Sequence, residues 1–189
     1  MSDKTSLRAD AQKNRERILL AAEAVFKEKG ASASLEDVAR HAGVGIGTLY
    51  RRFPTREVLL AATYNARFLS FAEESRARDN QLDAGSAVRA YLEEIVTHTM
   101  VYRGLAASLG TVLQSGTPGC HATTDEGRRL LQRAQQAGVL RDDVSFEDLV
   151  YVATAICLTV EQDDSPKTRI VHLVDLFLNG IGERSDSHQ

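Results

Sequence analysis

Residues 34–53, SLEDVARHAGVGIGTLYRRF, constrain the fold more than any other part of the chain, because they predict two short helices joined by a tight turn. Ser34 begins the capping-box pattern SLED, in which the hydroxyl accepts from a main-chain N–H and the acid reaches back. Gly43 can adopt a positive φ, which lets the chain reverse direction within three residues. Pro54 ends the second helix because proline disfavours helical geometry in the residue before it. The segment is therefore predicted to be a helix-turn-helix.

The second helix of this motif, expected over residues 45–51, contains residues that a packed core does not require. Leu49 can pack back on the first helix, whereas Gly45 and Gly47 have no side chain to pack. Each glycine lowers helix propensity by about 1 kcal/mol, which a helix with only a structural role rarely accepts. A helix in the major groove of DNA gains close backbone approach from such residues. The pattern therefore predicts contact with DNA.

The rest of the chain is also predicted to be helical, because apolar residues recur at helical spacing and no long segment alternates with the period of a strand. Further helices are expected over residues 10–29, 55–79, 83–103, 123–136, 146–160 and 166–179. A short helix and a flexible connection are expected in 104–119, and disorder in 1–9. The fold class is therefore all-α with about nine helices. We expect two domains, a three-helix helix-turn-helix domain over residues 1–57 and a helical domain over residues 58–189.

The charge is divided unevenly between these two parts. Residues 1–57 carry 11 Lys and Arg against 8 Asp and Glu, whereas residues 58–189 carry 12 against 18. The formal net charge of −3 for the whole chain hides this difference. A basic end on an acidic body is typical of a protein that meets a polyanion with one end only.

Three segments resemble the tetracycline-repressor (TetR) family of transcriptional regulators. They are AVFKEKG at the end of the first helix, the helix-turn-helix block, and PTREVLL at the start of the fourth helix. The resemblance runs through residues 12–60, and the motif is specific as a set although no single piece of it is. It implies a DNA-binding domain followed by a ligand-binding and dimerisation domain.

The resemblance implies contact with DNA for nine residues between the start of the second helix and the start of the fourth. They are Ser34, Gly45, Ile46, Gly47, Thr48, Tyr50, Arg51, Arg52 and Arg56. Ile46 and Thr48 would face base edges, with the glycines allowing close approach. Tyr50, Ser34 and Arg56 would contact phosphates, and the two arginines after Tyr50 would lie along the DNA backbone. Phosphate contacts set the register and base contacts provide the specificity.

The same residues have plainer explanations, which the sequence leaves open. Tyr50 can be a semi-buried aromatic residue, and the following arginines can form a solvated face. The third helix has no Arg, Asn or Gln in its first four positions, so direct reading of bases is expected to be limited. DNA shape and a basic arm would then contribute more. This arm consists of Lys4, Arg8, Lys13, Arg15 and Arg17.

Two apolar helices near the C-terminus are expected to form a dimer interface, as they do in the family that the chain resembles. Apolar residues on more than one side of a helix indicate burial by the protomer's own core and by a partner. The nine expected interface residues are Leu149, Val152, Ala153, Ile156, Val160, Ile170, Leu173, Val174 and Phe177. Two-fold pairing would place two recognition helices one turn of DNA, ~34 Å, apart. A thicker monomeric core is the alternative.

The resemblance implies a pocket for a small molecule in the middle of the chain, over residues 60–140, with Tyr151 as an additional lining residue. Its expected lining residues are Tyr64, Phe68, Phe71, Tyr91, Ile95, Met100, Leu105, Leu109, Leu113 and Tyr151. Each of them can also be structural core. The glycine-rich segment 104–119 would gate the pocket. The ligand would favour a conformer whose recognition helices are wrongly spaced for DNA.

We therefore expect a ligand-responsive repressor that binds a palindromic operator as a homodimer and is released by a small molecule. Its partners would be double-stranded DNA, a second copy of itself and an unidentified small-molecule effector. Four alternatives remain: an effector-independent DNA-binding protein, an activator, a protein that uses the motif to bind other proteins, and an enzyme. No residues stand in a recognisable catalytic context, so we expect no enzyme activity and no cofactor.

Cysteine usage and hydropathy predict a cytoplasmic protein. Cys120 and Cys157 are far apart in sequence, which favours two reduced thiols over a disulfide framework. The histidines are scattered, so we expect no metal site. Residues 1–13 lack the apolar segment of a signal peptide. The longest apolar run, near residues 150–160, is too short to span a bilayer, so we expect no membrane partner.

Overall fold

The computed structural model describes residues 2–101, 103–161, 163 and 165–181, and the side chains of these residues from Asp10 onward. Within these ranges the chain forms nine α-helices and one short 3-10 helix, without strands, so the predicted all-α fold is confirmed. In chain order the helices are α1 (Ser2–Lys29), α2 (Leu35–Ala42), α3 (Ile46–Arg52), α4 (Arg56–Ala77), α5 (Ala84–Met100), η1 (Ala106–Ser108), α6 (Leu109–Leu113), α7 (Pro118–Gln136), α8 (Phe146–Val160) and α9 (Pro166–Ile181).

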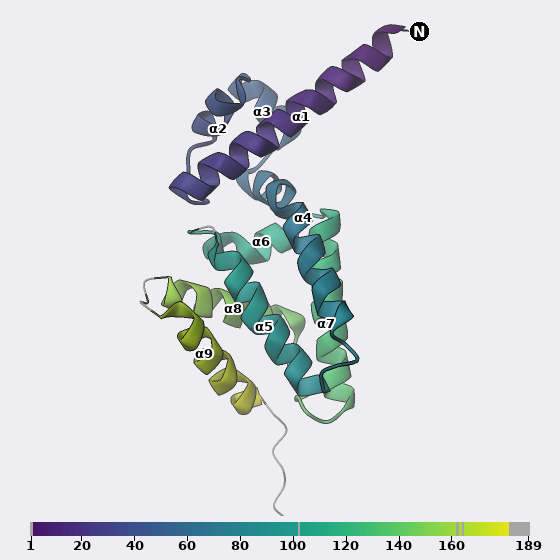
Figure 1. The fold of residues 1–189 in the computed structure, drawn as a ribbon, viewed down its shortest axis with the longest axis vertical. Helices are drawn as coiled ribbons and strands as arrows, with labels where there is room; N and C mark the ends of the chain where they lie inside the picture. The colour runs from purple at the N-terminus through teal and green to yellow at the C-terminus, as the bar shows by residue number, and fades with distance from the viewer. Residues whose placement is uncertain (1, 102, 162, 164, 182–189) are drawn as a thin grey trace, which may run out of the picture.

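Helices α1, α2 and α3 form a small bundle at one end of the molecule (Figure 1). Its core is built from apolar residues that recur on one face of each helix, among them Ile18, Phe26, Val38 and Leu49, all of which are fully buried. Gly30 follows α1 with a φ of 86°, the left-handed conformation that glycine adopts after a helix without steric cost. The bundle therefore presents α2 and α3 at the end of the molecule.

Helix α1 is longer than the sequence analysis predicts. It begins at Ser2, so the prediction of disorder was wrong for residues 2–9, and residue 1 lies outside the described part. Residues 2–29 contain neither Gly nor Pro, so no residue interrupts the helix before it reaches the N-terminus. The side chains of Lys4 and Arg8, expected in the basic arm, lie outside the described part of the chain.

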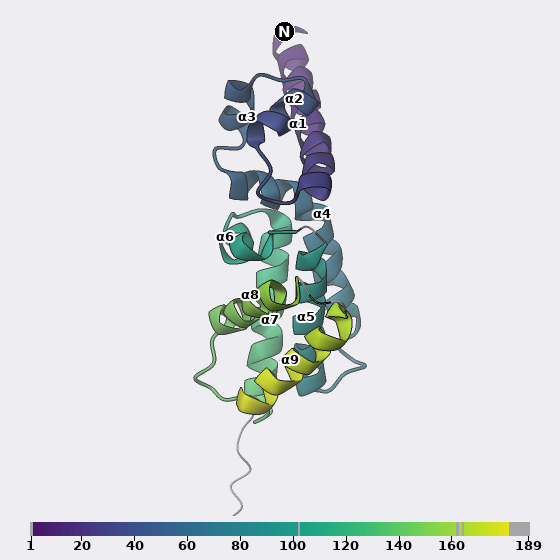
Figure 2. The ribbon, with the colours of Figure 1, turned by 90° about the vertical axis from the view of Figure 1, so that its left-hand side faces the viewer.

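Helix α4 leaves this bundle and enters the body, where it packs more extensively against α7 than against any other helix (Figures 1 and 2). The two helices approach closely at Gly119, because a Cβ atom at this position would lie 2.3 Å from the main-chain oxygen of Asn65. The Gly119 N–H instead donates a hydrogen bond to Asn65 Oδ1 at 2.8 Å. The contact fixes the beginning of α7 against the middle of α4.

Helix α7 begins earlier than the predicted start at residue 123. Thr117 accepts a hydrogen bond from the Cys120 N–H at 3.3 Å, and Pro118 occupies the first turn. Proline is favoured there because its missing N–H would have no partner in the helix. The same signal correctly predicts the start of α9 at Pro166. At residue 118 it was overlooked because glycines stand on both sides of the Thr-Pro pair.

Helix α5 lies in the middle of the body and packs against α7, α8 and α9 (Figure 1). Helix α8 begins and ends where the sequence predicts, at Phe146 and Val160. Its first turn has a complete capping box, in which Ser145 and Asp148 each accept a hydrogen bond from the other's main-chain N–H. The body is thus two pairs of helices, α4–α7 and α8–α9, held together by α5.

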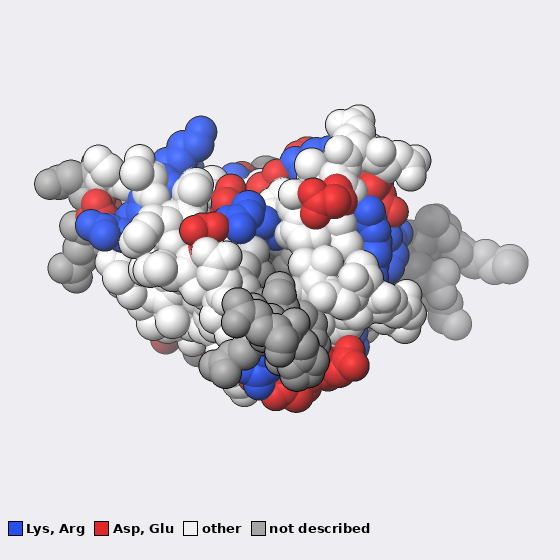
Figure 3. All heavy atoms as spheres, turned by 90° about the horizontal axis from the view of Figure 1, so that it is seen from below, with Lys and Arg blue, Asp and Glu red and all other residues white. Residues whose placement is uncertain are grey.

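The surface at the far end of the body, opposite α2 and α3, carries charges of both signs. Lys and Arg side chains alternate there with Asp and Glu across a largely uncharged surface (Figure 3). This mixture differs from the one-signed surface that attracts a polyanion. Among the described residues, no helix has the length and apolarity needed to cross a membrane.

Candidate nucleic-acid interface and effector cavity

The first helix of the predicted motif is capped by Ser34, whose side chain accepts a hydrogen bond from the Glu36 N–H at 3.1 Å. The predicted cap is therefore present. The reciprocal hydrogen bond, which the Asp37 carboxylate would accept from the Ser34 N–H, is not formed. This carboxylate instead pairs with Lys29 at 2.9 Å and with Arg40. Lys29 is the main cause of the lowered pKa of Asp37. The contact ties α2 to the end of α1.

The turn between α2 and α3 is closed by Gly43, which has a φ of 62° and donates its N–H to the carbonyl oxygens of Ala39 and Arg40. A residue with a Cβ atom is strained in this conformation. Arg17 of α1 donates to the Gly43 carbonyl at 3.4 Å, and Arg15 lies 5.9 Å from the centre of the Phe53 ring. These two members of the expected basic arm therefore pack on the motif.

Helix α3 buries one residue, Leu49, and exposes most of its others. Gly45, Gly47, Arg51, Arg52 and Ser34 are exposed, Thr48 is partly buried, and Ile46 and Tyr50 are exposed by 37% and 45%. A Cβ atom added at either glycine would meet no atom within 4 Å. Neither packing nor a left-handed backbone therefore requires these two glycines.

Arg56 holds the start of α4 against the turn between α1 and α2. Its Nη1 donates hydrogen bonds to the carbonyl oxygens of Ala31 at 2.9 Å and Ala33 at 2.5 Å. A bond from a charged donor is stronger than one between neutral groups. Arg56 thus has a structural role, and the contact with a phosphate stays a prediction.

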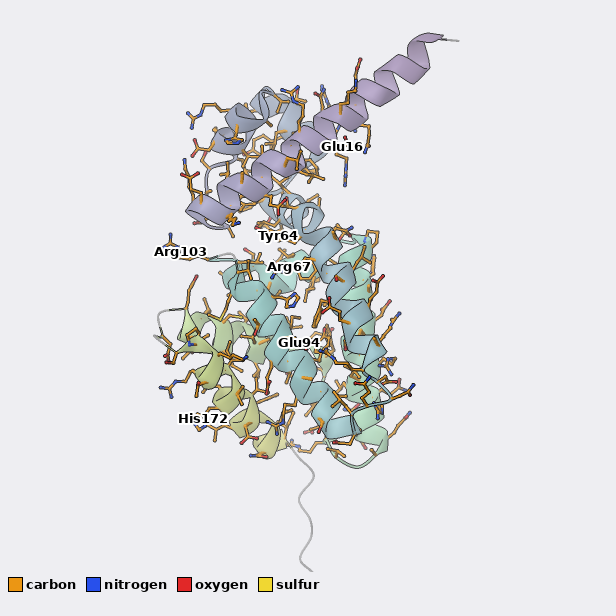
Figure 4. The ribbon with its side chains drawn as sticks, in the orientation of Figure 1. Glu16, Tyr64, Arg67, Glu94, Arg103 and His172 are labelled. Atoms are coloured by element: carbon orange, nitrogen blue, oxygen red, sulfur yellow. The ribbon has the colours of Figure 1, made fainter. Side chains whose placement is uncertain are left out.

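Two hydrogen bonds, together called the hinge joint, link the same turn to the body. The Ala31 N–H donates to the Arg103 carbonyl at 2.8 Å, and the Gly104 N–H donates to Glu161 Oε1, just after α8, at 2.7 Å. Gly30 permits this approach because a Cβ there would lie 2.8 Å from the Arg103 oxygen. Figure 4 shows Arg103 at the junction, facing the end of α1. The sequence could not predict this joint, because most of its hydrogen-bonding atoms belong to the main chain and Glu161 is 57 residues from Gly104 in sequence.

A buried carboxylate ties α4 to α7. Glu126 is 0% exposed and accepts hydrogen bonds from Ser75 Oγ at 3.0 Å, Arg76 Nε at 3.0 Å and Arg129 at 2.9 Å. Burial alone would raise the pKa of Glu126, but these three donors outweigh it and the pKa is lowered. The carboxylate therefore remains charged in the interior.

A second carboxylate extends this cluster toward the end of α4. Asp79 accepts hydrogen bonds from Arg129 at 3.0 Å and from Arg133 at 2.7 Å, and Arg129 is the main cause of its lowered pKa. We call the whole set the α4–α7 ionic network. Its members are Ser75, Arg76, Asp79, Glu126, Arg129 and Arg133.

Most of the residues expected to line an effector pocket form packed core. Eight of the ten are buried and Met100 is partly buried, whereas Tyr151 is 70% exposed. The eight are Tyr64, Phe68, Phe71, Tyr91, Ile95, Leu105, Leu109 and Leu113. The Tyr91 hydroxyl donates to the Thr123 carbonyl at 2.9 Å, and burial raises the pKa of Tyr91.

A cavity of about 260 Å³ lies between α6, α7 and α8 and has a different lining. Of the predicted residues, only Leu113 and Tyr151 border it. The others are Gly110, Gln114, His121, Thr124, Arg128, Phe146, Glu147 and Val150. Sequence reasoning missed them because α7 was expected to start at residue 123 and its polar face resembled an ordinary solvated surface.

The predicted dimer residues divide into two groups. Six are buried within the protomer: Leu149, Ala153, Ile156, Val160, Ile170 and Val174. Val152, Leu173 and Phe177 are only partly buried. Four other large apolar side chains on α8 and α9 are exposed, namely Tyr151, Leu158, Val171 and Leu176. The outer faces of both helices therefore carry apolar surface that the protomer does not cover.

Two family models match the sequence. The model of bacterial regulatory proteins of the tetR family matches residues 18–63, which contain α2, α3 and the start of α4. The model of the C-terminal domain of SbtR-like transcriptional regulators matches residues 83–183, more than half of the chain. The protein belongs to the TetR family of transcriptional regulators. The resemblance seen in residues 12–60 is thereby confirmed.

Solved structures of other TetR-family regulators agree with this assignment. The TetR transcriptional regulator SCO0520 from Streptomyces coelicolor is 32% identical, with 90% of this chain and 99% of that chain covered and a TM-score of 0.56. RolR in complex with resorcinol is 19% identical over 94% of this chain and 92% of that chain, with a TM-score of 0.69. FadR from Bacillus subtilis in complex with stearoyl-CoA is 16% identical over 88% and 98%, with a TM-score of 0.60. The last two show a shared fold.

A comparison with curated proteins found no match. The family models that do match describe DNA-binding regulators and indicate no enzyme family. Within the described residues, no three His, Cys, Asp or Glu side chains are grouped so as to hold a metal ion.

Proposed function

We propose that this protein is a ligand-responsive repressor that binds a palindromic operator as a homodimer and leaves it when a small molecule binds the body. The observation that carries the proposal is the outer face of α3, where two glycines with open space around them flank exposed Ile46. Such a face suits close approach to the major groove. A bacterial regulator of this kind would act in the cytoplasm, where its DNA lies.

Nine residues would make the DNA contacts. Ile46 and Thr48 would face base edges, and the remaining ones would lie against the sugar–phosphate backbone or allow its approach: Ser34, Gly45, Gly47, Tyr50, Arg51, Arg52 and Arg56. The exposure of Tyr50 and of the arginines after it supports this assignment. The domains would divide near residue 57, within the first turn of α4, so that α4 connects the DNA-binding domain to the effector domain.

A second copy of the chain would cover the apolar outer faces of α8 and α9. TetR-family regulators generally act as dimers, and two recognition helices bind far more tightly than one. Leu158 and Leu176 are exposed on these two helices, and Val152, Leu173 and Phe177 of the same helices are partly buried. The buried members of the predicted interface would support this surface from behind.

The response to a ligand is inferred from the cavity in the body and from structures of the same fold that hold small molecules, RolR with resorcinol and FadR with stearoyl-CoA. A ligand shifts the population toward the conformer that it binds better. If this conformer spaces the recognition helices wrongly, DNA is released.

The test is a mobility-shift titration with DNA from the region upstream of the protein's own gene, repeated over a series of salt concentrations. We expect specific binding with a steep salt dependence, because phosphate contacts release counterions. We also expect at least one compound of a small-molecule screen to abolish this binding. Binding without any responsive ligand would favour the effector-independent alternative. Failure to bind DNA at low salt would contradict the proposal.

A further inference from the structure

The cavity between α6, α7 and α8 has an apolar wall and a polar wall. At about 260 Å³ it is smaller than the roughly 300–1,000 Å³ of pockets for drug-sized molecules. We propose that it binds a small aromatic molecule carrying one carboxylate, and that this molecule is the class of effector to which the protein responds. The second half of this proposal rests on the proposed function.

The apolar wall is closely packed against its neighbours. Phe146, at the start of α8, fits into a notch in α7, because a Cβ atom at Gly127 would lie 2.3 Å from Phe146 Cε2. Gly110 of α6 adds no side chain, and a Cβ there would be in ordinary contact, 3.9 Å, with Val150 Cγ1. Phe146 is only 6% exposed and Arg128 covers the face of its ring, so a planar ligand would meet the part of the ring that borders the cavity edge to face.

The polar wall is dominated by hydrogen-bond donors. His121, Thr124 and Arg128 are spaced by three and four residues on α7, so they share one face of the helix, and all three line the cavity. Gln114 adds an amide from the end of α6. Arg128 Cζ lies over the Phe146 ring, 5.6 Å from its centre, so the guanidinium stands where the polar wall meets the apolar wall. Arginine presents paired N–H groups that match the two oxygens of a carboxylate.

A single carboxylate, that of Glu147, is found among the lining residues, and it already pairs with Arg128 at 3.0 Å. Both side chains are more than half exposed, at 57% and 55%. Exposed pairs of this kind are weak because water screens them. A ligand carboxylate that is partly enclosed against Phe146 can therefore compete with Glu147 for the guanidinium.

The opposite side of α7 is attached to α4, so a ligand on the cavity side has a physical route to the DNA-binding end. Thr123 Oγ1 donates to the Phe68 carbonyl at 3.2 Å, and Glu126 binds Ser75 and Arg76. Any ligand-dependent shift of α7 therefore acts on the helix that begins at the DNA-binding domain.

Calorimetric titration of the full-length protein tests the site without DNA. The probes are benzoate, the neutral analogue benzamide and the non-planar analogue cyclohexanecarboxylate. We expect benzoate to bind, and each analogue to bind at least several-fold more weakly. Absence of benzoate binding, or equal binding of benzamide, would overturn the proposal.

Two exposed side chains provide variants that should fold normally. Arg128→Gln should weaken benzoate binding by roughly tenfold, as expected for the loss of a charge-assisted hydrogen bond. Glu147→Gln should tighten it by about threefold, because it removes the competing carboxylate. Arg103→Gln alters an exposed arginine outside the cavity and should change nothing. Equal affinities in Arg128→Gln and the wild type would exclude this binding site.

The same probes in the mobility-shift experiment separate the site from the function. If benzoate binds as expected but does not release DNA, the site stands and its link to the regulator's response is wrong. If a molecule of another class releases DNA while benzoate does not bind, the proposed function stands and this inference falls.

Discussion

The fold of the protomer does not require glycine at Gly45, the N-cap of α3, or at Gly47 within the helix. Gly45 has φ and ψ of −69° and 145°, which any residue can adopt, and neither Gly45 nor Gly47 is near another side chain. Gly43 differs, because its φ of 62° lies in the left-handed region that favours glycine at this turn. The sequence alone could not separate the two kinds of glycine, because the distinction depends on space around the backbone.

Replacing Gly47 by alanine should separate stability from DNA binding. Gly47→Ala should raise the free energy of unfolding by up to about 1 kcal/mol, since alanine favours the helix. The added methyl group should weaken operator binding by roughly tenfold, or about 1.4 kcal/mol. Urea denaturation and fluorescence anisotropy with labelled DNA measure the two effects.

Gly180→Ala is the matched control, because Gly180 also lies in a helix and a Cβ atom added there would meet no atom within 4 Å. It should stabilise the protein by a similar or smaller amount and leave DNA affinity unchanged. Unaltered DNA binding in Gly47→Ala would mean that α3 does not approach DNA with this face.

Both cysteines should resist alkylation in the folded protein. Cys120 and Cys157 are buried and free, and burial raises the pKa of Cys157 to about 12. The reactive thiolate is therefore rare at pH 8. Mass spectrometry after treatment with iodoacetamide should find both thiols unmodified in buffer and both modified in denaturant. Rapid modification of Cys157 with the fold intact would contradict its burial.

Among the helices, the pairing of α4 with α7 was the part of the fold that the sequence could not predict. Apolar spacing predicted that both helices exist, because periodicity is a local property. The partners of Glu126 are about 50 residues away, apart from Arg129, and in sequence such charged residues look like a solvated face.

Helix caps are likewise predicted only as far as local sequence determines them. The pattern SLED predicted the cap of α2, but Lys29 of α1 takes the acid that a capping box would use.

The α4–α7 ionic network should make stability depend on pH in the acid range. Glu126 and Asp79 have pKa values below their usual 4.5 and 3.8 in the folded protein. The stabilisation that these two carboxylates give the fold is therefore complete above their pKa values in the unfolded chain. It is lost as the pH falls through their lower pKa values in the folded protein. Urea denaturation should show constant stability near neutral pH and a decline below pH 4.5.

The variant Glu126→Gln isolates the buried member of this network. At pH 7 it should lower the free energy of unfolding by about 2 kcal/mol, the scale of hydrogen bonds to a charged group. The difference from the wild type should shrink as the pH falls, because the wild-type carboxylate then becomes neutral. Glu57→Gln, an acid in the first turn of α4 outside the network, serves as control. A difference that stays constant with pH would show that Glu126 is not charged in the folded protein.

At the scale of the whole molecule, the exposed faces of α8 and α9 should hold the dimer together. Leu158 and Leu176 are 50% and 55% exposed. Leu158→Glu combined with Leu176→Glu should give a monomer in sedimentation velocity, because a charge within an apolar interface is costly to bury. Helical content by circular dichroism should be unchanged. Leu20→Glu introduces the same charge at an exposed position on α1 and should leave the dimer intact.

The hinge joint connects the end of α8 to the DNA-binding end, since Glu161 directly follows α8 and the Arg103 carbonyl accepts from the turn after α1. Glu161→Ala removes the acceptor of the Gly104 N–H, and the cost to global stability should be about 1 kcal/mol. Hydrogen exchange should become faster at the Gly104 amide. It should also become faster at the Ala31 amide, because the Arg103 carbonyl that binds this amide is no longer held by its neighbour. Faster exchange at Gly104 alone would mean that the two hydrogen bonds of the joint open independently. As a control, Glu23→Ala changes an exposed position on α1 and should alter the exchange of neither amide.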